Sequence, residues 1–196
     1  IHSFAKRAFR RNVEQEHSIN AVSLASNMLS EGRSFVESLR AGYRTILCSP
    51  EFLYLKENPG VLNDYQIASR LSYFLTGCPP DDTLQALAAT NQLRDARVRR
   101  RQVDRLLGIG NERVASYAGR ENLSRQFVKD FSAEWLDLDQ MDFTQPDRKL
   151  YRNYDPIVRM AMLDETHEFL VDMVLKDHPV KNLVAADYTY LNSRLC

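Results

Sequence analysis

Helical signals are concentrated in residues 34–51, which read SFVESLRAGYRTILCSPE. Ser34 and Glu37 have the spacing of a capping box, in which each side chain accepts a hydrogen bond from a backbone amide that the first helical turn leaves unpaired. Ser49 and Pro50 form a second start signal, because proline is well tolerated in the first turn of a helix. The stretch therefore predicts a helix that ends near Cys48 and a short helix directly after it. Apolar side chains recur at helical spacing within it: Val36, Leu39, Tyr43, Ile46 and Leu47.

Similar start and stop signals continue on both sides of this stretch, and strand signals are nearly absent. On the N-terminal side, a helix over residues 13–31 would form a hairpin with the helix that starts after Ser34. On the C-terminal side, residues 137–154 show no regular period and are predicted to form a long loop. Capping residues and apolar periodicity predict further helices over about residues 64–76, 82–88, 95–107, 121–136 and 155–176.

These patterns predict an all-α fold, an irregular bundle of about seven to nine helices with an N-terminal helical hairpin. We expect residues 1–48 to form the hairpin module and residues 49–196 to form a larger helical domain. The first residue is Ile1 and the last is Cys196, so both ends are expected to be cut from a longer protein, with the larger domain truncated at its C-terminal end. The predicted core contains Ile46, Leu47, Leu71, Phe74, Phe127, Phe131 and Trp135.

Composition narrows the class of protein. The chain has 196 residues, with 26 Lys and Arg against 26 Asp and Glu. A nucleic-acid binder usually carries a basic excess, so this balance argues against one. Leu, Ile, Val and Phe make up about a quarter of the chain, above the roughly 20% that marks disordered chains. No apolar run approaches the roughly 18 residues of a membrane-spanning helix, and the charged N-terminal stretch lacks an apolar signal-peptide centre.

The three cysteines do not form a recognisable metal or haem motif. Cys48, Cys78 and Cys196 are widely spaced, without a Cys-x-x-Cys pair or a Cys-x-x-Cys-His sequence. The spacing therefore predicts neither a zinc site nor covalently attached haem in this segment. Cys48 lies in an apolar run and is predicted to be buried, as free cysteines often are. Cys78 precedes two prolines in a turn and is expected to be more exposed, where it could pair with a thiol outside this segment.

Two carboxylate–histidine pairs are candidate metal ligands. Glu14 and His17, and Asp164 and His167, are each three residues apart and so share a helix face. Di-iron bundles use two such pairs and a glutamate from each of two other helices, a role open to Glu37 and Glu134. However, Glu14 and His17 lie in a first helical turn, where acids are common, and aspartate replaces glutamate in the second pair. A solvated charged face explains both pairs, and we predict no metal site.

A stripe of acids near residue 165 is a candidate for acid–base chemistry. It consists of Asp164, Glu165, Glu168 and Asp172, with His167 among them. Four acids on one helix are more often a solvated face, which is the interpretation favoured here. Glu165 lies on the flank of the apolar stripe, and a buried Arg70 or Arg159 would make it a structural ion pair. The catalytic residues therefore remain unknown from sequence.

The strongest local charge bias is a cluster of arginines between residues 94 and 105. These arginines could bind an acidic partner, an anionic lipid or nucleic acid. Because they point around the whole predicted helix, a solvated helix whose arginines pair with Asp95 and Asp104 is favoured. No glycine-rich phosphate loop and no nucleophile-elbow motif accompanies them, so nucleotide-dependent and serine-based catalysis lose their usual signals. The cluster consists of Arg94, Arg97, Arg99, Arg100, Arg101 and Arg105.

Seven short sequence motifs follow one another along most of the chain. They are FAKRAFRR (4–11), ILCSPEFLY (46–54), DYQIASRLSYFL (64–75), PDD (80–82), FSAEWL (131–136), ET (165–166) and ADYTYLN (186–192). Together they resemble uncharacterised helical domains best known from planctomycetes. The chain departs from that pattern at Asn12, where proline is common.

The resemblance implies a context rather than a reaction. Such modules follow a c-type cytochrome-like domain in large exported proteins, which implies an extracytoplasmic location, with any haem outside residues 1–196. The function expected from this is a non-catalytic scaffold or interaction module whose partners are neighbouring domains, without nucleic acid. Two alternatives stay open: an enzyme module that acts on a surface polymer through paired carboxylates, with residues 137–154 over a cleft, and an accessory subunit of a membrane-associated redox complex. Tyrosines outside the core either dock to neighbouring modules or cover this domain's own core: Tyr151, Tyr154, Tyr188 and Tyr190.

Overall fold

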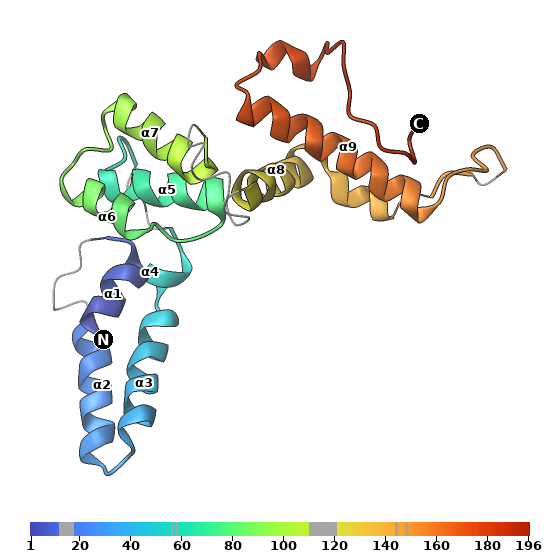
Figure 1. Cartoon of the computed structure of the whole chain (residues 1–196). Helices are drawn as coiled ribbons and strands as arrows, with labels where there is room; N and C mark the ends of the chain where they lie inside the picture. Colours follow the sequence, from blue (N-terminus) through green and yellow to red (C-terminus); the bar gives the residue numbers. More distant parts are fainter. Residues whose placement is uncertain (12–17, 56, 58, 110–120, 144, 148) are drawn as a thin grey trace. The chain divides into compact units, whose positions relative to one another are not determined.

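The computed structural model describes residues 1–11, 18–55, 57, 59–109, 121–143, 145–147 and 149–196. Over these residues the fold is all-α, with nine α-helices and no strand, as the sequence predicts (Figure 1). The α-helices are α1 (His2–Phe9), α2 (Ile19–Ser30), α3 (Phe35–Leu47), α4 (Pro50–Leu53), α5 (Asp64–Thr76), α6 (Asp82–Ala89), α7 (Ala96–Leu107), α8 (Glu121–Leu136) and α9 (Pro156–Leu175). Two short 3-10 helices follow α8 and α9, namely η2 (Leu138–Asp142) and η3 (Val180–Leu183).

The contacts divide the chain into two compact units. Unit 1 comprises Ile1–Val103 and unit 2 comprises Asp104–Cys196, so the division falls inside α7. The predicted division after residue 48 stays a prediction. Within the described residues, no helix is long and apolar enough to cross a membrane.

Helices α2 and α3 form the N-terminal hairpin of unit 1 (Figure 1). The predicted capping box starts α3: the Glu37 amide donates to the Ser34 hydroxyl at 3.3 Å, and the Ser34 amide donates to the Glu37 carboxylate at 3.2 Å. Because the Ser34 side chain donates to it as well, the pKa of Glu37 is lowered, with the Ser34 contacts as its largest causes.

Helix α1 packs on this hairpin through two alanines and a phenylalanine. Ala5, Ala8 and Phe9 form a buried cluster with Ala21 of α2 and Ile46 of α3. The predicted burial of Ile46 is confirmed. The predicted burial of Leu47 and Cys48 is wrong, since both are exposed. Ile46 occupies the face toward α1, and the next two positions are turned away from it by the helical repeat.

Gly42 allows α2 and α3 to approach closely. A Cβ added at Gly42 would lie 2.9 Å from the carbonyl oxygen of Ala21, which is backbone and cannot move alone. We expect Gly42→Ala to lower the free energy of unfolding by about 1–2 kcal/mol, because overpacking outweighs the gain of about 1 kcal/mol in helix propensity. Urea unfolding followed by circular dichroism measures the change. Ser23→Ala, on the exposed side of α2, is the control, and an equal or higher stability for Gly42→Ala would contradict the close approach.

Helices α5 and α6 pack together in the second part of unit 1. The buried face of α5 consists of Asp64, Ala68, Ser69, Ser72 and Leu75. The prediction that Leu71 and Phe74 lie in the core is therefore wrong for Phe74, which is 62% exposed, and only partly right for the half-buried Leu71. Helical periodicity predicts burial for the bulkier residues, whereas the buried face of α5 consists mostly of small ones.

Unit 2 is built on the pair α8 and α9. Val128 packs with Leu170 and Val171, and the partly buried Phe127 covers this cluster. Phe131 and Trp135 were predicted in the core, but both are exposed on the same side of α8, where neighbouring rings stack at centroid distances of 5.7 and 5.5 Å. The buried positions of α8 beyond Phe127 are again small, namely Ser124, Val128 and Ser132.

Candidate functional site

The first turn of α5 connects to other parts of unit 1 through polar contacts. Asn63 caps the helix, and its side chain accepts a hydrogen bond from the backbone N–H of Gln66 at 2.9 Å. In return, the Gln66 side chain accepts from the backbone N–H of Asn63 at 2.8 Å. This capping box uses the oxygen of each side chain, so the side-chain NH₂ groups of both residues remain available to donate hydrogen bonds. Asp64 follows as the first helical residue and is 1% exposed.

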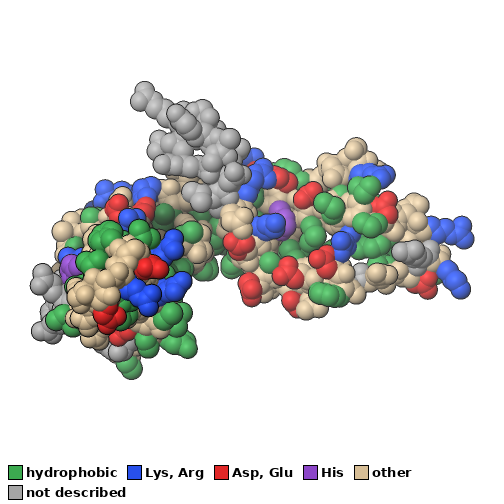
Figure 2. Space-filling model, turned by 90° about the horizontal axis from the view of Figure 1, so that it is seen from below, with side chains coloured by type: hydrophobic (Ala, Val, Ile, Leu, Met, Phe, Trp, Pro, Cys, Tyr) green, Lys and Arg blue, Asp and Glu red, His purple; other side chains and the backbone are tan. Residues whose placement is uncertain are grey.

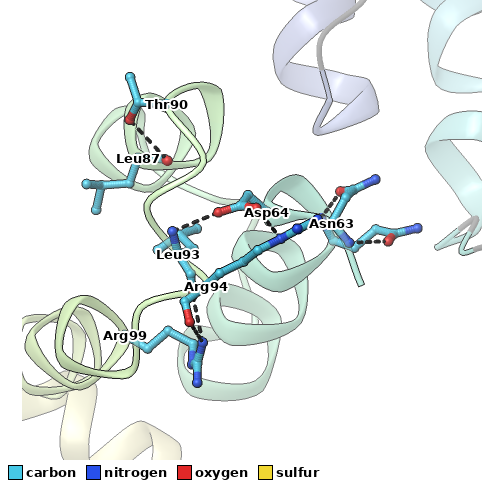
Figure 3. A network of polar contacts seen from close by, with 8 residues as sticks. Asn63, Asp64, Leu87, Thr90, Leu93, Arg94 and Arg99 are labelled. Carbon is cyan, nitrogen blue, oxygen red and sulfur yellow. Dashed lines mark hydrogen bonds and ion pairs between the residues drawn. The ribbon is translucent and has the colours of Figure 1, made fainter. Parts of the chain in front are cut away.

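The buried Asp64 carboxylate holds the connection between α6 and α7 (Figure 3). Its Oδ1 accepts from the Leu93 amide at 2.8 Å, and its Oδ2 lies 3.2 Å from the Nε of Arg94. Arg99 donates to the carbonyl oxygens of Leu93 and Arg94 at 2.9 and 2.8 Å. Oδ2 has no hydrogen bond of good geometry within the described residues, so its charge is balanced by the Arg94 ion pair. The arrangement fixes the α6–α7 connection against α5.

Arg10 joins three helices of unit 1. It ends α1 in the left-handed conformation, with φ of 54°, and is 8% exposed. Its guanidinium donates to the Tyr73 hydroxyl at 3.0 Å and to carbonyl oxygens at 3.0, 3.1 and 3.2 Å, and it lies over the rings of Phe52 and Tyr73. The three carbonyls belong to Glu51, Phe52 and Tyr54. Sequence reasoning missed this role, because Arg10 is one of four basic residues in a short stretch and nothing local marks it as buried.

A cavity of about 460 Å³ lies beside Arg10, between the end of α1, the region of α4 and the start of α5. We call it the Arg10 cavity. Its volume is within the range of small-molecule sites. The Glu51 carboxylate and the Arg11 guanidinium line it, and neither makes a hydrogen bond or ion pair with the described part of the chain. The remaining lining combines aromatic and polar side chains: Phe9, Tyr54, Leu55, Glu57, Asn63, Tyr65, Gln66 and Ser69.

Two carboxylates, Glu51 and Glu57, line the Arg10 cavity, and Glu57 is not suited to act as a general acid. Arg70 donates to both carboxylate oxygens of Glu57, from its Nε at 2.8 Å and from one of its NH₂ groups. These hydrogen bonds are the largest cause of the lowered pKa of Glu57. A general acid at neutral pH needs a raised pKa. Glu57 therefore stays ionised and cannot supply the proton.

A second cavity, of about 250 Å³, lies under the predicted loop, which contains η2 and is thus not entirely irregular. Asp142 and Asp155 line it. Asp142 forms an ion pair with Arg159, and Asp155 caps α9 by accepting from the Val158 amide at 2.8 Å. Both carboxylates are therefore used in structural contacts.

The structure describes only part of the candidate metal-ligand set. Glu14 and His17 lie outside the described residues. Asp164 and His167 lie on α9, where burial is the largest cause of the lowered pKa of His167. Over the ranges that the structure describes, there is no cluster of three or more His, Cys, Asp and Glu side chains suited to a metal ion.

The acid stripe on α9 holds other parts of unit 2 in place. Thr189 donates to Glu165, and Arg125 pairs with Glu168. Arg70 and Arg159 were considered as partners of Glu165, but they pair with Glu57 and Asp142 instead.

Asp172 anchors the C-terminal segment to α9. Hydrogen bonds lower its pKa, from Lys176 first and then from Tyr190 and His178, and the bond to Asp172 is the largest cause of the raised pKa of Tyr190. Tyr188 packs against the rings of Phe169, His178 and Tyr190. Of the two predicted roles for Tyr188 and Tyr190, these contacts favour covering the domain's own core.

The lowered pKa of Asp172 predicts a pH dependence of stability. Because the folded pKa lies below the ordinary value of 3.8, the stabilisation is complete above about pH 5 and is lost as the pH falls through the folded pKa. We expect Asp172→Asn to lower Tm at pH 7, and this difference should shrink below pH 3.8. Asp164→Asn, an exposed position on the same helix, is the control. A difference in Tm that is constant with pH would contradict the prediction.

The arginines around α7 divide into structural and exposed groups. Arg94 and Arg99 belong to the Asp64 network, whereas Arg97 and Arg101 are exposed. Asp95 accepts from the Arg97 backbone amide at 2.8 Å, so its role is to cap the turn. On the face shown in Figure 2, basic and acidic side chains are intermingled.

The three cysteines are free and exposed.

Two family models match the chain. The model described as PSD4, protein of unknown function (DUF1592), matches residues 62–196, and the model described as PSD5, protein of unknown function (DUF1595), matches residues 1–57. The predicted resemblance to these uncharacterised domains is confirmed, and the association with a cytochrome stays a prediction. Searches of curated proteins and of solved structures give no match.

Proposed function

The chain belongs to the PSD4 family of proteins of unknown function (DUF1592), and from this premise we propose that it is a non-catalytic scaffold or interaction module of a larger exported, cytochrome-associated protein. One observation carries the proposal. Arg10, in the segment that PSD5 matches, binds Tyr73, in the segment that PSD4 matches. The two segments thus meet within one compact unit, and we propose that this unit serves as a scaffold for neighbouring domains.

The partners that we propose are neighbouring domains of the same or an associated protein. Large apolar side chains at Phe143, Leu150 and Tyr151 support this, because all three are exposed in unit 2. Exposed apolar patches that contain aromatic side chains are typical of interaction surfaces. Tyr154, by contrast, lines the second cavity.

An extracytoplasmic location and a haem-bearing domain elsewhere in the parent protein complete the proposal. Their support is the family resemblance. The alternative of a polymer-cleaving enzyme is less well supported, because Glu57 in one cavity and Asp142 in the other are engaged by arginine. No observation favours the redox-subunit alternative over the module.

The natural reading frame that encodes the chain, tagged and expressed in its own host, tests the proposal. We expect the parent protein in the exported fraction, with a positive haem stain. After limited proteolysis, its fragments should stay together on gel filtration. The combined variant Phe143→Ser, Leu150→Ser and Tyr151→Ser should release a fragment, whereas Val61→Ser, an equally exposed change in unit 1, should not. A cytoplasmic parent without haem, or fragments that separate in the unmodified protein, would contradict the proposal.

A further inference from the structure

We propose that the Arg10 cavity binds a neutral sugar unit. Its described lining comes from three parts of the chain, which begin at Phe9, Glu51 and Asn63, and its volume of about 460 Å³ suits a small ligand. The residues that line the cavity belong to unit 1, whereas Phe143, Leu150 and Tyr151 of the proposed docking surface belong to unit 2.

The charges of the lining favour a neutral ligand. Arg10 and Arg11 contribute two positive groups, and Glu51 and Glu57 contribute two negative groups. Arg10 is engaged by Tyr73 and backbone carbonyls, and Glu57 is engaged by Arg70. Among the described lining residues, Arg11 and Glu51 are therefore the charged side chains whose hydrogen-bonding groups are left for a ligand. A phosphate or sulfate would be attracted by Arg11 and repelled by Glu51, whereas a neutral ligand can hydrogen-bond to both.

The unused hydrogen-bonding groups match hydroxyls. The side-chain NH₂ groups of Asn63 and Gln66 are donors left over from the capping box. The Tyr65 hydroxyl can donate or accept, and the Glu51 carboxylate only accepts. A sugar hydroxyl donates and accepts at the same atom, so a ring with several hydroxyls satisfies both kinds of group at once.

Aromatic rings supply the rest of the lining. Tyr54 is 69% exposed and borders the cavity, and Phe9 and Tyr65 lie within its wall. A pyranose ring has one apolar C–H face, which packs well on an aromatic ring while its hydroxyl edge remains hydrogen-bonded. A lining that joins tyrosine rings, side-chain amides and one carboxylate therefore fits a sugar better than it fits a purely apolar molecule.

Titration of the ¹⁵N-labelled 196-residue chain tests the inference. The probes are glucose, galactose, mannose, N-acetylglucosamine and cellobiose, each added separately, with sodium phosphate as the anionic probe. We expect at least one sugar to shift the amide resonances of α4 and of the first turn of α5 saturably, with a dissociation constant on the order of 1 mM. Phosphate should leave these resonances unchanged.

Two variants assign the binding to the cavity. Tyr54→Ala removes the exposed ring but keeps the carbonyl that Arg10 binds, and Glu51→Ala removes the acceptor. Each should weaken sugar binding by about fivefold to tenfold. Phe35→Ala and Glu31→Ala are matched controls, because both positions are exposed and lie outside the lining. The inference is overturned if no sugar of the panel saturates, if phosphate shifts the same amides, or if the cavity variants bind as the controls do.

Discussion

Arg10→Met is expected to lower the free energy of unfolding of unit 1 by about 3–5 kcal/mol, the largest effect of any single substitution considered, because a buried charged donor group is lost. The guanidinium is the hydrogen-bond donor for the Tyr73 hydroxyl and for the carbonyls of Glu51, Phe52 and Tyr54. Methionine fills similar space but donates nothing. The carbonyls would then have to find water or move apart.

Native-state hydrogen exchange of unit 1 measures the loss, since the single tryptophan, Trp135, lies in unit 2. Amides of α1 and α5 should exchange faster in Arg10→Met. Arg10→Lys keeps the charge but cannot reach four acceptors at once, so its effect should be intermediate. Arg11→Met is the matched control, because Arg11 is the next residue and makes no hydrogen bond with the described part of the chain; a change within about 0.5 kcal/mol is expected there. Equal effects at the two positions would show that the Arg10 contacts do not hold unit 1 together.

Helix starts were the most predictable feature of this fold. The capping residues Ser34, Asn63, Asp81 and Asp155 each accept a backbone hydrogen bond at the start of a helix, as their residue types indicate. A cap is predictable because its partners lie within three residues in the sequence. The same locality made the N-terminal hairpin predictable.

The faces of the helices were harder to predict. In α5 and α8 the bulky apolar residues Phe74, Phe131 and Trp135 are exposed, while Ala68, Ser72 and Ser132 are buried. Periodicity identifies a stripe of large apolar residues, but close helix packing selects small residues, which allow the backbones to approach. Which face of a helix is buried depends on the helix that packs against it, and the sequence of a single helix does not contain that information.

The candidate site could not be predicted from local patterns for a related reason. Arg10 and Asp64 are buried charges, and hydrophobic periodicity assigns charges to the surface. Their partners are 63 and 29 residues away in the sequence, at Tyr73 and Leu93. The Arg10 cavity likewise exists only because three separate segments meet. Its residue types were visible in the sequence, but their convergence was not.

The second large effect is expected at Asp64. Asp64→Ala should lower the free energy of unfolding by about 2–4 kcal/mol, because the buried Leu93 amide loses its acceptor and the α6–α7 connection loses its anchor. Asp64→Asn keeps an oxygen for that amide but removes the charge that faces Arg94, so about 1–2 kcal/mol is expected. Because Arg94 is 62% exposed, water can solvate its guanidinium once the partner is gone. Most of the loss should therefore come from the Leu93 hydrogen bond.

Asp82 provides a matched control for this experiment. Like Asp64, it is the first residue of a helix and follows a capping residue, so both carboxylates interact with the helix dipole in the same way. The Asp82 side chain, however, is 87% exposed and lies 4.0 Å from its nearest basic partner, Arg7. Asp82→Ala should thus cost only about 0.3–1 kcal/mol. Urea unfolding of both variants separates the dipole contribution from burial, and a cost at Asp64 no larger than that at Asp82 would mean that the buried network does not fix α5 to the α6–α7 connection.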